Sequence, residues 1–382
     1  MKKILFYIIS LLDYVFQKNN KKVVYTSFPD FSDNSFAMFI YISNNYQEYQ
    51  SIWLIDKMEK VDLYKKMTLN YTKNDKYKIV KKNSLIGIYY YLTSKYVFFS
   101  HGLYTGVSIP KNHFVINLWH GMPLKSIAYL DVEFKGIIQK AKYIISTSPM
   151  YQEILANAFK INKSNVLVTG QPRNDLLLTD SSNISYKFVV KDSYKNIFMW
   201  MPTYRRSILG DIRVDGNETD SLPIISIKDL DELNLVLKEI NSFMIIKLHP
   251  MDILTLKKFD IYTNISIIKN NDLEIKGMQL YTLLADIDVL LTDYSSVYID
   301  FLLTGKPIAF IVEDMEAYFN SRGFVFNRPV DYMPGAIITN KESFFEFLKT
   351  PYIHSNYKKI ALKFNSVIEN SSENIFRKVI NK

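Results

Sequence analysis

The sequence predicts an α/β protein with two doubly wound domains, and two observations support that prediction. Short, continuous apolar runs of strand type alternate with helical or loop segments, a pattern typical of parallel sheets covered on both faces. The runs form two series on either side of the polar segment 179–196, so we expect domains at 1–185 and 186–382, with final helices that could pack back on the first. The expected strands are 23–27, 51–55, 96–100, 114–119, 143–147 and 166–169, then 197–201, 244–248, 265–268, 289–292 and 308–312.

The N-terminal segment predicts a helix with two open interpretations. Its apolar run, 4–12, is too short to span a bilayer, is followed by Asp13, and has no small-residue cleavage site after it. Apolar residues at helical spacing favour either an in-plane amphipathic helix with basic flanks at a membrane, or a helix packed on its domain. These residues are Ile4, Ile8, Leu11, Leu12 and Val15.

Composition narrows the class of protein. The 382 residues are 48% hydrophobic and 22% charged, which is typical of a globular chain, and the absence of cysteine excludes disulfides and thiolate metal sites. No compact carboxylate cluster is evident, so we expect no protein-bound metal and no cofactor, leaving open an ion that accompanies a diphosphate.

The net charge of +9 is unevenly distributed. Between Lys57 and Lys82, nine lysines against three acidic residues give a net charge of +6. This segment would suit an anionic membrane or a polyanion, or it is simply a solvated surface. No nucleic-acid-binding motif accompanies it, and we expect no nucleic-acid partner.

The segment 288–307 has the pattern of a buried strand, a hydroxyl-rich turn and a helix. The strand would end near Thr292, and Asp293, Ser295 and Ser296 are residue types that begin helices. Free N–H groups beside two serine hydroxyls could bind an anionic group, although the isolated pattern also describes an ordinary capped helix.

Four more motifs follow expected strands, where α/β sheets bind ligands. His120, with Gly121 and Lys125 after it, could take a proton near neutral pH. Two other motifs follow strands of the second series: Thr203 and Arg205 offer a hydroxyl and a guanidinium for phosphate oxygens, and His249 again ends a strand. The fourth motif is Asp33–Asn34, for which a turn capping the first helix is the simplest interpretation.

Together these motifs resemble the CDP-glycerol glycerophosphotransferase family, which includes the wall teichoic acid primases and polymerases and their capsule-synthesis relatives. The resemblance covers nearly the whole chain, in family order. It rests on Ser32–Asn34, Trp119–Gly121, Pro202–Arg205, Lys247–Pro250, Thr292–Ser296 with Asp300, and Arg322–Gly323 near Pro334–Gly335. It implies a GT-B fold, in which two Rossmann-like domains face a central cleft, with the donor on the C-terminal domain and the acceptor toward the N-terminal one. Longer polymerases carry extra N-terminal sequence, so this chain resembles a bare catalytic module.

The activity implied is transfer of a polyol phosphate from a CDP-activated donor, most simply CDP-glycerol, to a lipid-linked or polymer acceptor, with release of CMP. We expect His120 to be the general base, and His249 and Arg205 to bind the diphosphate with Ser295 and Ser296. The enzyme would be peripheral at the cytoplasmic face of the bacterial membrane. The alternatives are a CDP-ribitol donor, a nucleotide-sugar transferase or epimerase of the same fold, and a non-enzymatic membrane- or polyanion-binding protein.

Overall fold

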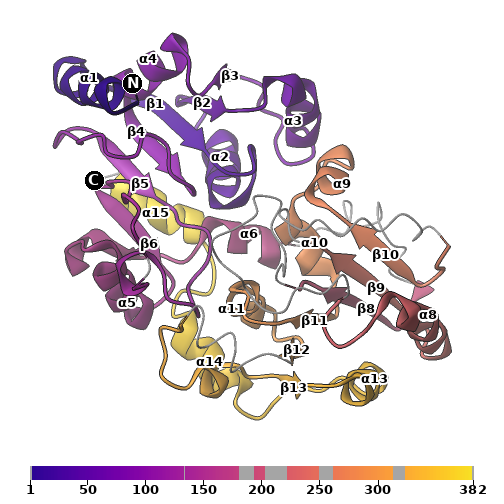
Figure 1. Ribbon diagram of the computed structural model, residues 1–382. Helices are drawn as coiled ribbons and strands as arrows, with labels where there is room; N and C mark the ends of the chain where they lie inside the picture. The colour runs from indigo at the N-terminus through magenta and orange to yellow at the C-terminus, as the bar shows by residue number, and fades with distance from the viewer. Residues whose placement is uncertain are drawn as a thin grey trace.

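The computed structural model describes residues 2–132, 134–179, 193–202, 222–248, 261–312 and 323–380. Two parallel sheets form its framework, with strand orders β3-β2-β1-β4-β5-β6-β7 and β10-β9-β8-β11-β12-β13 (Figure 1). Every pair of neighbouring strands is parallel. The predicted α/β class with two doubly wound sheets is therefore confirmed.

The N-terminal sheet contains every strand expected of it and one more. The additional strand, β3, lies at the sheet edge within the lysine-rich segment, and its alternation of lysine with half-buried apolar residues hid it among the charges. The strands are β1 (Asn19–Thr26), β2 (Gln50–Ile55), β3 (Tyr77–Lys81), β4 (Ser94–Phe99), β5 (Phe114–Asn117), β6 (Tyr143–Ser146) and β7 (Val166–Val168).

Helices cover both faces of this sheet, which is why its strands are apolar on both sides. Side chains of α2 (Asp33–Asn45), α3 (Val61–Thr68) and α15 (Ser371–Val379) pack on one face, around Tyr25 and Trp53. Those of α1 (Lys2–Val15) and α4 (Leu85–Thr93) pack on the other, around Val24 and Leu54. The C-terminal helix α15 thus lies against the N-terminal sheet, with the Phe376 ring stacked 3.8 Å from that of Tyr46.

The C-terminal sheet contains the five expected strands and a short edge strand, β13, that was not expected. Its strands are β8 (Asn196–Trp200), β9 (Ser242–Lys247), β10 (Ile265–Ile268), β11 (Val289–Thr292), β12 (Ile308–Ile311) and β13 (Ala336–Ile338). One face packs on α8 (Leu230–Glu239) and α13 (Lys341–Lys349). The other packs on α10 (Leu280–Asp286), α11 (Val297–Phe301) and α14 (Tyr357–Phe364). The proposed domain boundary near residue 185 lies outside the described residues.

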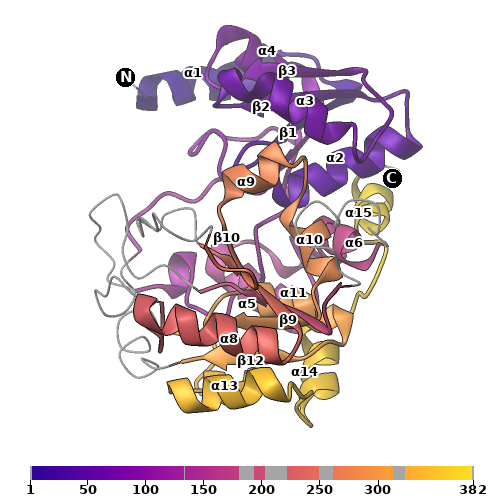
Figure 2. The same ribbon diagram turned by 90° about the vertical axis from the view of Figure 1, so that its right-hand side faces the viewer.

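The two halves meet along one side through α3 and α9 (Asn270–Ile275), as Figure 2 shows. The Asn70 amide donates to the Gly277 carbonyl over 2.7 Å, and Lys60 forms an ion pair with Glu274. The Tyr71 hydroxyl accepts a hydrogen bond from the backbone N–H of Gln279 over 2.7 Å. These contacts set the distance between the two carboxyl edges of the sheets.

The N-terminal helix α1 has properties of both predicted interpretations. Ile9 and Asp13 face inward and are fully buried. The Asp13 carboxylate pairs with Lys18 over 2.6 Å and with His113 Nδ1 over 2.8 Å, so the acid that interrupts the apolar run anchors the helix. Ile4, Ile8, Leu11 and Val15 remain exposed on the outer side. In the part of the chain that the structure describes, we find no helix with the length and apolarity to cross a membrane.

Candidate active site

The N-terminal half of the site lies where the strand order reverses between β1 and β4, a usual place for ligands in α/β sheets. Asp33 and Asn34 follow β1, His101 follows β4 and His120 follows β5. Ser32 occupies the N-cap position of α2 without a side-chain cap bond, and the Asp33 carboxylate accepts the Asn34 backbone N–H over 2.8 Å at the start of the helix. The turn has a further role, because the Asn34 side-chain amide donates to the carbonyls of Leu118 and Trp119, each over 3.0 Å. Asn34 therefore holds the loop that carries His120.

The bonding of His120 defines its tautomer. Its Nδ1 lies 3.0 Å from the Ser100 carbonyl oxygen, which can only accept, so Nδ1 carries the hydrogen and Nε2 carries the lone pair. The ring is stacked 4.2 Å from that of His101, with 3.9 Å between the centroids of His120 and Trp119. Burial lowers the pKa of His120, against the Ser100 bond and the Asp33 charge, which raise it. The imidazole is therefore neutral near pH 7 and can accept a proton at Nε2.

Gly121 brings the two halves of the site into contact. It has a φ of +137°, and a Cβ added there would lie 2.3 Å from the Ser296 hydroxyl oxygen and 3.0 Å from an Arg173 nitrogen. Only glycine accommodates both that backbone conformation and so close an approach. The His120 loop of the N-terminal half therefore abuts Ser296 of the C-terminal half.

Arg173 is the central residue that sequence reasoning missed. It lies in α6 (Pro172–Leu178) and donates from Nη1 to Asp33 over 2.8 Å and to the His120 carbonyl over 3.0 Å. Its Nη2 donates to Asp300 of α11 over 2.7 Å. The signal was present as Gly170-Gln-Pro-Arg-Asn-Asp175, a glycine and a helix-starting proline directly after a strand.

A carboxylate on each side balances this guanidinium: Asp300 is fully buried and Asp33 is partly buried. Asp300 also accepts from the Tyr281 hydroxyl over 2.6 Å and from the Asn174 amide over 3.2 Å. Burial alone would raise the pKa of Asp33, but the charge of Arg173, helped by His101 and His120, outweighs it and lowers that pKa. The Asp33 carboxylate is thereby held ionised, and through Arg173 and Asp300 one hydrogen-bonded network joins the two halves.

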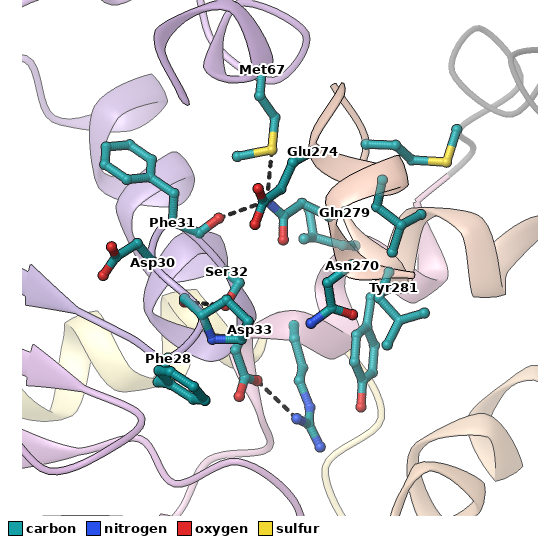
Figure 3. Close-up of a pocket in the computed structure, with 16 residues that line it drawn as sticks. Phe28, Asp30, Phe31, Ser32, Asp33, Met67, Asn270, Glu274, Gln279 and Tyr281 are labelled. Carbon is teal, nitrogen blue, oxygen red and sulfur yellow. Dashed lines mark hydrogen bonds and ion pairs between the residues drawn. The ribbon is translucent and has the colours of Figure 1, made fainter. Parts of the chain in front are cut away.

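A cavity of about 160 Å³ lies beside this network, between the loop after β1 and the α9–α10 segment. Figure 3 shows Phe28, Phe31 and Met67 on one side and Gln279 and Tyr281 on the other, with Asp33 bonded at its lower edge. The Gln279 amide donates to the Phe31 carbonyl over 2.9 Å, which joins the two walls. The cavity could hold a small polar group beside aromatic rings.

The described donor-side candidates differ in what they contact. Thr292 is buried, and its hydroxyl donates to the Met201 carbonyl over 3.0 Å, so it links β11 to the end of β8. Asp293 is also buried, whereas Ser295 and Ser296 are half-buried at the start of α11. That α-helix ends at Phe301 and continues as a 3-10 turn to Thr304.

Other candidates are partly placed. Lys125 forms an isolated antiparallel bridge with Phe324, so the His120 loop also meets the segment after Gly323. Thr203, Arg205 and His249 lie outside the described residues, as does Arg322 of the resemblance. Lys247, two residues before His249, is buried and donates to Asn270 Oδ1 over 2.6 Å, and burial lowers the pKa of Lys247 to about 8.

Among the described side chains, no group of three His, Asp or Glu is placed to hold a metal ion.

The chain is similar in sequence to proteins of known function. The chain is 28% identical over 382 residues to the teichoic acid poly(glycerol phosphate) polymerase of Bacillus spizizenii, covering 93% of this chain and 88% of that protein. It is 25% identical over 280 residues to the teichoic acid poly(ribitol-phosphate) polymerase of the same organism, covering 68% of this chain but 42% of that longer protein.

Solved structures show the same fold. One is a variant of the wall teichoic acid polymerase TagF soaked with CDPG, with a TM-score of 0.76 and 22% identity over 100% of this chain and 93% of that one. The family model described as CDP-Glycerol:Poly(glycerophosphate) glycerophosphotransferase matches residues 8–381. The chain is therefore an enzyme of the CDP-glycerol glycerophosphotransferase family, which acts in teichoic acid synthesis.

Proposed function

We propose that this enzyme transfers glycerol phosphate from CDP-glycerol to a hydroxyl group of a lipid-linked or polymer acceptor, releasing CMP. The observation that supports it most directly is the contact between the His120 loop and Ser296, which brings a neutral imidazole and phosphate-binding hydroxyls to one place. The family to which the chain belongs supplies the donor class.

In this mechanism His120 Nε2 takes the proton of the acceptor hydroxyl as its oxygen attacks the glycerol-bearing phosphorus. A new phosphorus–oxygen bond forms, and the bond from that phosphorus to the bridging oxygen of CMP breaks. Ser295 and Ser296 bind phosphate oxygens, and Arg205 and His249 stabilise the negative charge that develops on the departing CMP. Such transfers depend chiefly on alignment and charge stabilisation.

The donor experiment separates the alternatives. CMP or UDP release is measured with CDP-glycerol, CDP-ribitol and UDP-N-acetylglucosamine, each with a lipid-linked saccharide acceptor. We expect CDP-glycerol to give the highest kcat/KM. Preference for CDP-ribitol would make the enzyme a ribitolphosphotransferase. The similarity to a ribitol-phosphate polymerase is the reason for including this donor. Turnover of the UDP-sugar alone would overturn the proposal.

The acceptor chemistry also implies attachment to the cytoplasmic face of a membrane. Helix α1 exposes Ile4, Leu11 and Val15, and the adjacent α4 exposes Leu85 and Ile86. The two helices lie side by side in both Figure 1 and Figure 2. Strand β3, which belongs to the lysine-rich segment, precedes α4 in the chain and contacts it. This contact brings basic residues near the exposed apolar ones.

Vesicle sedimentation tests this attachment. A short apolar face inserts modestly, and each lysine near an anionic leaflet adds about 1 kcal/mol, which salt screens. The protein should sediment with phosphatidylglycerol vesicles at low salt, release at high salt, and bind less after Leu11→Ser with Leu85→Ser. The control Leu235→Ser with Leu362→Ser changes two exposed leucines elsewhere. Equal recovery with neutral and anionic vesicles would contradict the proposal.

A further inference from the structure

A second, larger groove of about 710 Å³ lies in the N-terminal half, outside the cleft. We call it the lysine groove, after Lys111, Lys140, Lys142 and Lys160, which line it. It is bounded by α1 at Tyr14, by the loops that precede β5 and β6, and by the end of α5 (Pro149–Phe159). In Figure 1, α1 and α5 lie along the same side of the molecule.

The groove carries charge of one sign. Four lysines line it, and none of its described lining residues is acidic. Lys111, Lys140 and Lys160 are exposed, whereas the half-buried Lys142 donates to the Lys111 carbonyl over 2.6 Å. Lys160 lies 4.1 Å over the Tyr129 ring, which places its ammonium against the groove wall. A concave surface with this charge attracts an anion with several oxygens, such as a phosphate or diphosphate.

Most of the remaining lining is apolar, which a free inorganic anion does not need, although Ser108 and Gln139 also contribute. Ile109, Ile137, Ile161 and Phe159 contribute to the walls, and Ile137 is 68% exposed. Tyr14 belongs to α1, whose outer side exposes further apolar residues. Lysines and apolar walls together match an amphiphile, with its phosphate on the ammonium groups and its chain leading toward α1.

A short chain of ring contacts connects the groove with the candidate base. The Phe159 ring lies 4.8 Å from that of Trp119, edge to face, and Trp119 lies against His120. A ligand seated against Phe159 is therefore separated from the His120 loop by a single side chain.

We propose that the lysine groove binds one molecule of a phosphate-headed lipid. If the transferase function proposed above holds, this lipid is the anchored end of the acceptor, whose distal hydroxyl reaches His120. The binding itself does not depend on turnover, so the two proposals can fail separately.

The test measures binding of farnesyl diphosphate by calorimetry, without detergent and with saturating CDP to occupy the donor site. Wild-type protein should bind one equivalent, and Lys111→Gln, Lys140→Gln and Lys160→Gln together should weaken binding about tenfold or more. The control replaces Lys349, Lys358 and Lys359 with Gln, removing the same charge from exposed positions elsewhere. This control should bind as the wild type does.

Three results would overturn the inference. One is equal weakening by the groove and control variants, which would mean that net charge alone matters. Another is binding of the probe only when CDP is left out of the titration, which would place it in the donor site. The third is binding of inorganic pyrophosphate as tight as that of farnesyl diphosphate, which would show that the apolar walls contribute nothing. With the lipid-linked acceptor, the groove variant should raise the acceptor KM and leave the CDP-glycerol KM unchanged.

Discussion

The carboxyl edges of the two sheets are built differently. In the N-terminal half, the functional side chains are bonded to one another: Asn34 holds the His120 loop, and Arg173 joins Asp33 to Asp300. In the C-terminal half, Ser295 and Ser296 are half-buried hydroxyls at the start of α11. Under the proposed function, this difference favours an N-terminal edge that is preorganised to align the base and a C-terminal edge whose hydroxyls bind phosphate oxygens.

Loss of the base should have the largest effect. We expect His120→Ala to reduce transfer by about a hundredfold to ten-thousandfold, the usual contribution of a positioned base, while CDP-glycerol affinity stays near that of the wild type. The measurements are CMP release and calorimetric titration with the donor. His354→Ala, on a surface loop, serves as the control.

Two outcomes would break this assignment. Near wild-type turnover of His120→Ala would remove His120 from the reaction. A loss of thermal stability together with activity would instead show that the ring is chiefly a packing element between His101 and Trp119.

The ionic network should dominate the stability of the acceptor side. Arg173→Met leaves the buried Asp300 and the partly buried Asp33 without their counter-charge, and breaking a buried pair typically costs about 3–5 kcal/mol of the free energy of unfolding. Urea unfolding measures the change. The control is Arg377→Met, because Arg377 pairs with Glu373 at the surface, where such pairs contribute about 0–1 kcal/mol. Equal stability of the two variants would show that the network does not hold the halves together.

The sequence predicts the acceptor side less completely than the sheets. Apolar strand runs identify eleven of the thirteen strands found in the described parts of the chain, since a buried parallel strand leaves a local signal. The two strands without that signal are β3, which has two exposed lysines among its five residues, and β13, which is only three residues long with one of them exposed. Arg173 was missed for a different reason: its partners lie 140 and 127 positions away along the chain, at Asp33 and Asp300. Only the folded arrangement shows that this arginine is balanced and buried.

Removal of the donor-side hydroxyls should have an intermediate effect. Ser295→Ala with Ser296→Ala should weaken CDP-glycerol binding, because each lost hydrogen bond to a charged oxygen costs about 1.5–3 kcal/mol. Calorimetry compares this variant with Ser343→Ala, whose hydroxyl bonds only locally to Asn340. Stability should barely change, in contrast to Arg173→Met. An unchanged donor affinity would return α11 to the role of an ordinary helix.

The smallest expected effect is a shift in the pH profile, and it tests whether the acceptor side tunes its base. His120 must be neutral to accept a proton, and burial lowers its pKa, so kcat/KM should fall on the acid side only below the ordinary histidine pKa of 6.5. His101 does not contribute to this limb, because burial and the neighbouring His120 lower its pKa to about 3. The Asp33 charge raises the pKa of His120, so Asp33→Asn should move the acid limb to still lower pH. An acid limb at or above 6.5 in the wild type, or one that Asp33→Asn leaves in place, would show that another group controls the protonation step.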